Sequence, residues 1–85
     1  MSYRIEIQNR ALKSIKKISE PHKTTIKNRI ELLKDFTKDM PNIKALQGQY
    51  KGLYRLRAGV YRVLFNVADK STIIIIDVFA RKDGY

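Results

Sequence analysis

The stretch GLYRLRAGVYRVLF, residues 52–65, carries the strongest structural signal in the chain. Two β-rich runs, 53–57 and 60–67, lie on either side of Ala58-Gly59. Two such runs separated by a two-residue break containing glycine are typical of a tight hairpin. A third β-rich run, 72–79, follows the short break 68–71. The second half of the chain is therefore predicted to form an antiparallel meander.

The first half is predicted to contain one strand and two helices. Apolar residues alternate with polar ones over 3–8, which indicates a half-buried strand. Helical spacing of apolar residues then predicts a short basic helix from residue 9 and a longer helix over about 20–37. Residues 37–51 lack periodicity and are expected to form a loop or crossover. The expected fold is α+β in the order β-α-α-β-β-β, with the helical hairpin on one face of a small, mostly antiparallel sheet. The pattern leaves open whether the first strand lies beside the second or the fourth.

Length and composition narrow the class of protein. The 85 residues are enough for a single domain, 1–85, and the absence of cysteine excludes disulfides and thiolate metal sites. We expect a cytoplasmic protein that has no membrane partner, because the sequence shows neither a signal-peptide pattern nor a spanning apolar run. The net charge of +10 favours a polyanionic partner, with nucleic acid first and acidic proteins second.

The predicted register gathers arginines on one face of the sheet. With Ala58 and Gly59 as the turn, Arg55 lies opposite Arg62, and a four-residue loop at 68–71 places Asp77 opposite Arg62 too. Arg81 points to the same side. This arrangement depends on register, and a one-residue error in either loop would scatter the side chains. The predicted face holds four cations and one acid: Arg55, Arg57, Arg62, Arg81 and Asp77.

The opposite face is predicted to be apolar and covered by the helices. Its expected members are Tyr54, Leu56, Tyr61, Val63, Phe65, Val67, Ile74, Ile76 and Val78. A simpler interpretation of the charged face is an ordinary Arg62–Asp77 ion pair among solvated arginines. That interpretation leaves the other three cations without a reason to share one surface.

Guanidinium groups bind phosphate in a bidentate manner, so the predicted cluster suits a phosphodiester. Tyr50 and Tyr85 are aromatic residues that could stack on an unpaired base, with loop packing and chain-end fraying as the ordinary alternatives. The single histidine, His22, is expected on the surface and far from the cluster. The sequence contains no metal-ligand spacing, no phosphate-binding glycine loop and no complete Ser-His-Asp set, and no cofactor is expected.

Three segments resemble the RelE/ParE superfamily, the toxins of bacterial and archaeal type II toxin-antitoxin systems. They are NRALKSIKKI, LQGQYKGLYRLRAGVYRVLFNV and IIIIDVFARKDGY, and the similarity runs from Tyr3 to Tyr85. The hairpin and the closing segment are closer to the RelE branch. The resemblance implies a RelE-like toxin domain that acts as a ribosome-dependent, metal-independent mRNA endonuclease. It also implies an antitoxin that wraps the toxin with an acidic segment.

The resemblance also implies roles for particular residues. Arg62, Arg81 and Tyr85 match positions of the family's active site, and Arg55 matches a basic position that is our candidate for a leaving-group contact. Leu53 stands where some members have a lysine, so the general base stays open, with Lys51 as one candidate. The residues expected to bind RNA or the ribosome are Lys13, Lys16, Lys17, Lys44, Lys51, Arg57 and Lys82.

Two other functions remain open at this point. A toxin of the same fold can inhibit DNA gyrase without catalysis, as the ParE branch does. A basic RNA-binding module with no chemistry of its own would also have this charge.

Overall fold

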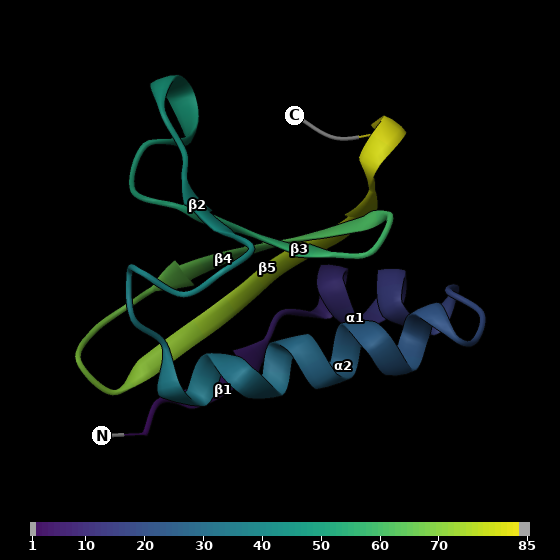
Figure 1. Ribbon diagram of the computed structural model, residues 1–85, viewed down its shortest axis with the longest axis horizontal. Helices are drawn as coiled ribbons and strands as arrows, with labels where there is room; N and C mark the ends of the chain where they lie inside the picture. Colours follow the sequence, from purple (N-terminus) through teal and green to yellow (C-terminus); the bar gives the residue numbers. More distant parts are fainter. Residues whose placement is uncertain (1, 84–85) are drawn as a thin grey trace.

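The computed structural model describes residues 2–83, which form two helices packed on a five-stranded sheet (Figure 1). The helices are α1 (Asn9–Lys16) and α2 (His22–Leu32), and α2 runs on into the 3-10 turn η1 (Leu33–Asp35). The strands are β1 (Arg4–Ile7), β2 (Ile43–Ala45), β3 (Tyr54–Ala58), β4 (Tyr61–Val67) and β5 (Thr72–Ala80). Two further 3-10 turns are η2 (Gly48–Tyr50) and η3 (Arg81–Asp83). The predicted α+β class and the order of its main elements are confirmed.

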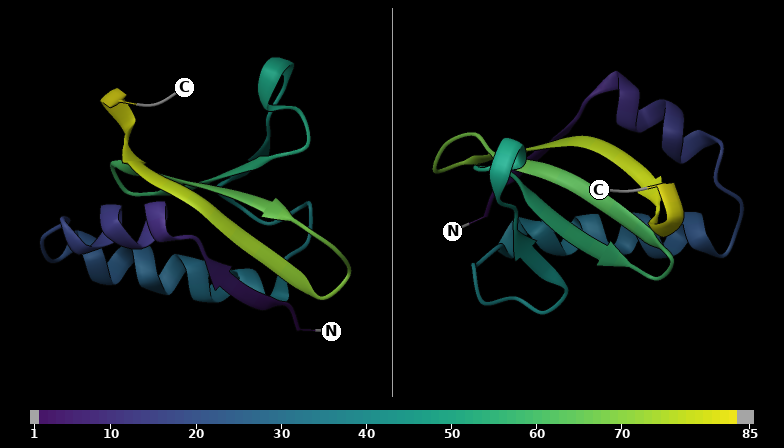
Figure 2. Two further views of the ribbon diagram at one scale, coloured as in Figure 1. Left: turned by 180° about the vertical axis from the view of Figure 1, so that it is seen from behind. Right: turned by 90° about the horizontal axis from the view of Figure 1, so that it is seen from above.

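The sheet order is β1-β5-β4-β3-β2, which answers the question that the sequence left open. β1 pairs in parallel with β5, so the first strand lies beside the last one, and the other neighbours are antiparallel. Both helices cover one face of the sheet, whereas η2 and η3 rise from the other face (Figure 2). The uncovered face therefore offers the surface on which the arginines were expected.

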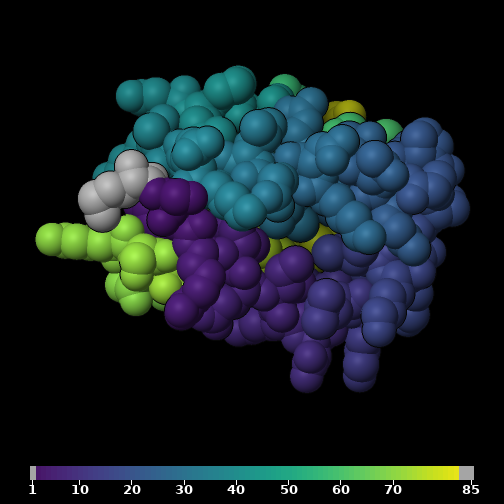
Figure 3. Space-filling view, turned by 90° about the horizontal axis from the view of Figure 1, so that it is seen from below, coloured from purple at the N-terminus to yellow at the C-terminus, as the bar shows by residue number. Residues whose placement is uncertain are grey.

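The core lies between the helices and the covered face. Apolar side chains recur on the inner side of each helix, and the sheet contributes the other half of the layer. Figure 3 shows α2 lying alongside α1 and β1 on the outside of this layer. Complete burial of one valine, leucine, isoleucine or phenylalanine side chain contributes about 1.5–3 kcal/mol to the stability of the fold. The most buried residues are Ala11, Ile26, Leu33, Val63, Phe65, Ile73 and Ile75.

A bulge in β5 corrects the predicted covered face. Phe65 pairs with Ile75, whereas Leu64 pairs with Asp77, so Ile76 is an extra residue in β5. Ile73 and Ile75 consequently enter the core, and the prediction of Ile74 and Ile76 there was wrong. The other seven predicted members of that face either belong to the core or pack against it.

Both ends of the second helix differ from the predicted range of about 20–37, because it begins at His22 and ends at Leu32. The first helix begins at Asn9, as expected, and ends at Lys16. The expected loop 37–51 contains the short strand β2, which pairs with β3, and the turn η2. A three-residue strand is too short to produce a periodic pattern, so β2 could not be recognised from alternation.

Candidate nucleic-acid interface

Arg62 and Arg57 face each other across the β3–β4 hairpin. The turn is Gly59-Val60, one residue later than predicted, so the expectation that Arg55 lies directly opposite Arg62 was wrong; Arg55 pairs with Leu64. Gly59, the first of the two turn residues, has a φ of +63°, a left-handed value that glycine adopts readily in tight hairpin turns. Because sliding the turn by one residue shifts both strands together, the three arginines of the hairpin (Arg55, Arg57 and Arg62) stay on the predicted face.

Arg62 is anchored at the centre of this face. Only 9% of the residue is exposed, and its Nη1 donates hydrogen bonds to the carbonyl oxygens of Gly59 (3.1 Å) and Tyr61 (3.0 Å). Burial, followed by the positive charges of Arg55, Arg81 and Arg57, lowers the pKa of Arg62. The turn thus holds a guanidinium in a place where its charge is unfavourable.

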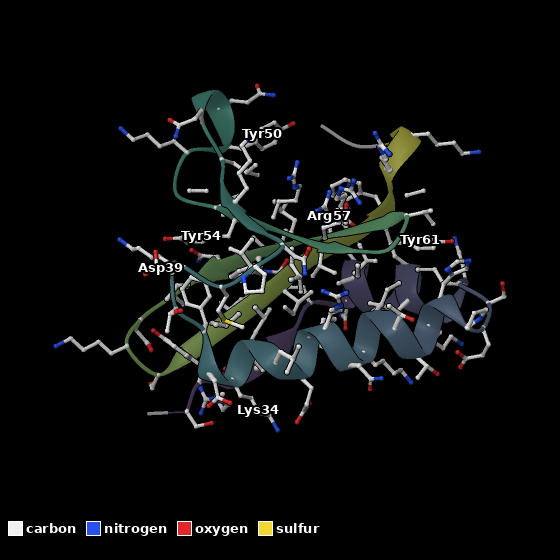
Figure 4. All side chains as sticks on the ribbon, viewed as in Figure 1. Lys34, Asp39, Tyr50, Tyr54, Arg57 and Tyr61 are labelled. Carbon is white, nitrogen blue, oxygen red and sulfur yellow. The ribbon has the colours of Figure 1, made fainter. Side chains whose placement is uncertain are left out.

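Arg81 joins the same group from the end of β5. Its backbone N–H donates to the carbonyl of Val60 at 2.7 Å, which ties η3 to the hairpin turn. Arg55 is half-buried, and its Nε–H is buried without a hydrogen-bond partner within residues 2–83. Arg57 is exposed and points away from the helices (Figure 4). We call Arg55, Arg57, Arg62 and Arg81 the arginine cluster.

Asp77 does not neutralise the cluster, contrary to the predicted register. It pairs with Leu64 rather than Arg62, and its Oδ2 lies 3.2 Å from Nε of Arg10 on α1. Its Oδ1 accepts hydrogen bonds from the backbone N–H of Val78 (2.8 Å) and from the hydroxyl of Ser14 (3.4 Å). The Arg62–Asp77 ion pair that the simpler interpretation required is therefore absent from the described residues.

Three of the predicted lysines flank the cluster, and three do not. Lys44 of β2 lies directly opposite Arg55, and Lys82 follows Arg81 in η3. Lys51 follows η2, which rises on the same side of the sheet. The remaining cations, Lys13, Lys16 and Lys17, are exposed on or just after α1, across the sheet from the cluster.

The aromatic predictions have different outcomes. Tyr50 is half-buried on η2 and lies on the cluster side of the sheet (Figure 4). Tyr85 lies outside the described residues. His22 was expected on the surface, but it is half-buried, with its ring centroid 5.5 Å from that of Tyr61. Sequence reasoning also missed Arg10 and Ser14, which both contact Asp77 of β5. Their spacing of four residues indicates that they lie on one side of the helix, but it does not indicate which strand they face.

Two findings concern other classes of site, and both apply to residues 2–83. No three His, Cys, Asp or Glu side chains gather there in a way that could hold a metal ion. No helix in that range has both the length and the apolar character needed to cross a bilayer.

A two-helix layer on a five-stranded sheet, with a group of arginines on the open face that has no carboxylate partner within residues 2–83, defines a small protein of the RelE-like fold. Comparison with known proteins narrows this class. A family model described as the ParE toxin of the type II toxin-antitoxin system parDE matches residues 5–85. A curated protein of Methanocaldococcus jannaschii, named "Putative toxin RelE1", is 35% identical over 99% of this chain and 94% of its own length. The chain belongs to the RelE/ParE superfamily and is a RelE-like toxin of a toxin-antitoxin system.

Solved structures agree with this assignment. RelE in the RelB–RelE complex from Methanococcus jannaschii is 28% identical, with a TM-score of 0.74 and 92% of each chain covered. RelE in the archaeal RelE–RelB complex from Pyrococcus horikoshii is 27% identical, with a TM-score of 0.73, covering 99% of this chain and 100% of that one.

Proposed function

We propose that this toxin is a ribosome-dependent endonuclease that cleaves messenger RNA. The observation that carries the proposal is the arginine cluster itself. A buried arginine is fixed by two carbonyls, is surrounded by three like charges, and is left without an acid among the described residues. A like-charge group of this kind opposes folding, so its natural counter-charge is a bound anion. A phosphodiester held by two or more guanidinium groups supplies that charge.

The chemistry requires one bond to form and one to break. The 2′-oxygen attacks the adjacent phosphorus, the bond from phosphorus to the 5′-oxygen breaks, and a proton passes from the 2′-hydroxyl to a base while the 5′-oxygen gains one. Arg62 and Arg81 stabilise the extra negative charge on the phosphate. A donor aimed at such a transition state typically supplies about 3–4 kcal/mol. Arg55 contacts the leaving 5′-oxygen.

Proton transfer is the weak point of this site. Arginine stays protonated at neutral pH and hardly exchanges protons there. Tyr85 is the candidate for orienting or deprotonating the 2′-hydroxyl, but a phenol titrates near 10. Free RNA should therefore be cleaved slowly. The ribosome, by holding the message in a reactive geometry, supplies the part of the rate enhancement that these side chains cannot provide. The RNA of the ribosome is bound by two groups of cations. One group lies beside Arg55, Arg62 and Arg81 (Lys44, Lys51, Arg57 and Lys82), and the other lies on or just after α1 (Lys13, Lys16 and Lys17).

Primer extension on messages from cells that express the toxin tests this proposal. We expect cuts in register with codons for the wild type, and none for Arg62→Ala. Arg4→Ala is the matched control, because Arg4 is an exposed arginine on β1 that pairs with Glu6 at 2.8 Å. Equal cleavage by both variants, or no cleavage by the wild type, would refute the endonuclease.

The match to the ParE family model favours one second candidate, a toxin that inhibits DNA gyrase. This function predicts DNA breaks without codon-registered cuts in messages. If Arg81→Ala leaves growth arrest intact and only weakens ribosome binding, a binding module without catalysis replaces both candidates.

We further propose that an acidic antitoxin segment binds this toxin and neutralises it. The net charge of +10 and the crystallisation of related RelE proteins with RelB support this proposal. An acidic protein encoded next to the toxin should restore growth when the two are co-expressed, and should co-purify with it. Continued growth arrest despite expression of that neighbour would count against the pairing.

A further inference from the structure

Asp77 is a buried carboxylate that the proposed chemistry does not use. The residue is 7% exposed, and three groups bind its oxygens: the guanidinium of Arg10, the hydroxyl of Ser14 and the N–H of Val78. Arg10 and Ser14 are four residues apart on α1 and so lie on one side of that helix. A single carboxylate thus connects the basic helix to the last strand.

Asp77 also sits at the bulge of β5. If the pairing of Phe65 with Ile75 continued without a bulge, Asp77 would lie opposite Val63, which is completely buried in the core. The extra residue Ile76 removes the carboxylate from that position. The N–H of Val78, directly after the bulge, is bound by the Asp77 side chain. The carboxylate therefore satisfies the backbone at the point where the bulge departs from regular pairing.

The bulge decides where Arg81 lies. It shifts the rest of β5 by one residue, so that Ala80 pairs with Tyr61 and the N–H of Arg81 reaches the carbonyl of Val60. Val60 is part of the turn that also anchors Arg62 through Gly59. Without this shift Arg81 would advance by one position along the hairpin, and its side chain would change sides.

We propose that Asp77 is a positioning residue for Arg81. Its carboxylate, held by Arg10 and Ser14, locks the bulge that turns the end of β5 toward Arg62. The proposal rests on the proposed endonuclease for its effect on rate, and on the backbone geometry alone for its effect on Arg81.

Electrostatics alone predicts the opposite effect on function. Removing an acid from a protein that binds RNA raises its positive charge and strengthens attraction to phosphate. A loss of cleavage after removal of Asp77 therefore has to come from geometry. A displacement of about 1 Å at a reacting group lowers a rate by as much as about 100-fold.

The test measures single-turnover cleavage of a defined message on programmed ribosomes, together with ribosome affinity. We expect Asp77→Ala to lower the cleavage rate at least about tenfold while affinity is unchanged or higher. Asp77→Asn keeps an oxygen for the N–H of Val78 but loses the ion pair to Arg10, so its rate should fall in between. Asp39→Asn removes an equal charge from an exposed turn and should match the wild type.

Two further measurements separate positioning from general damage to the fold. In an Arg81→Ala background, Asp77→Ala should cause no further loss of rate, because its effect acts through Arg81. Hydrogen exchange of the Arg81 amide should accelerate about tenfold in Asp77→Ala, while the amides of the β3–β4 hairpin stay protected.

An equal loss of rate in both backgrounds, or unchanged exchange at Arg81, would overturn the positioning role. If the wild type does not cleave messages at all, the endonuclease proposal fails, and the exchange measurement still decides the role of Asp77.

Discussion

Replacing Arg57 by glutamine should make the free toxin more stable. Arg57 is exposed and faces Arg62 across the hairpin, so its loss removes a like-charge contact and little packing. Two unit charges about 5–7 Å apart repel each other in water by about 0.6–0.8 kcal/mol, and Arg55 on the same strand face adds a smaller amount. After screening, we expect the free energy of unfolding to rise by about 0.5–1 kcal/mol. For a domain of this size, the melting temperature should rise by about 2–8 °C.

Thermal unfolding followed by circular dichroism measures this change. The gain should be largest at low ionic strength and should shrink in about 1 M salt, where the Debye length falls to about 3 Å. Arg4→Gln is the matched control, since it removes an attractive pair with Glu6 instead of a repulsive one. It should leave the melting temperature unchanged or lower it. If Arg57→Gln is destabilising at low salt, or its effect does not depend on salt, the cluster is not the strained, unneutralised group described above.

Three further predictions concern the core, the loops and RNA binding. Phe65→Ala removes a completely buried ring and should lower the free energy of unfolding by about 3–5 kcal/mol in urea titrations; a loss below about 1 kcal/mol would contradict the assigned core. The backbone N–H of Ser71, followed by its hydroxyl, lowers the pKa of Asp69. The carboxylate therefore stabilises the fold above its unfolded pKa of about 3.9, and this contribution is lost as the pH falls through the lower folded value. Acid titrations should show Asp69→Ala less stable than the wild type at pH 6, with the gap closing below about pH 4; a gap that persists at pH 2 would refute this. Ribosome binding should weaken steeply with salt, and replacing Lys13, Lys16 and Lys17 by glutamine should flatten that dependence without changing the cleavage rate of bound message. An unchanged salt dependence would mean that α1 does not contact RNA.

Periodic and turn-rich segments revealed most of the fold to sequence reasoning. Alternation over 3–8 and the helical spacing after it identify the first half, and the glycine hairpin identifies the second. The position of the turn was wrong by one residue. The arginines nevertheless kept their face, because a turn that slides moves both of its strands, whereas only a change in loop length exchanges the faces.

The main difference between the predicted and the observed sheet is the bulge in β5, which falls at the end of a run of four isoleucines. Residues 73–76 are all apolar and β-branched, so alternation cannot tell which of them enter the core. Asp77 lies at the bulge that decides this, and two of its partners, Arg10 and Ser14, lie more than sixty residues earlier on α1. Long-range pairing of this kind leaves no local pattern. For the same reason the position of β1 beside β5 could not be predicted.

The parallel pairing of β1 with β5 also affects when the toxin can form. β5 lies in the interior of the sheet, between the first strand and β4, yet it is the last strand of the described chain to be synthesised. Until β5 and Arg81 have left the exit tunnel, a growing polypeptide therefore lacks the strand with which β1 pairs and one member of the arginine cluster. If the toxin acts on ribosomes as proposed, the ribosome that makes it meets no complete arginine cluster before β5 and Arg81 have emerged, and the proposed antitoxin segment can bind the toxin as soon as it folds.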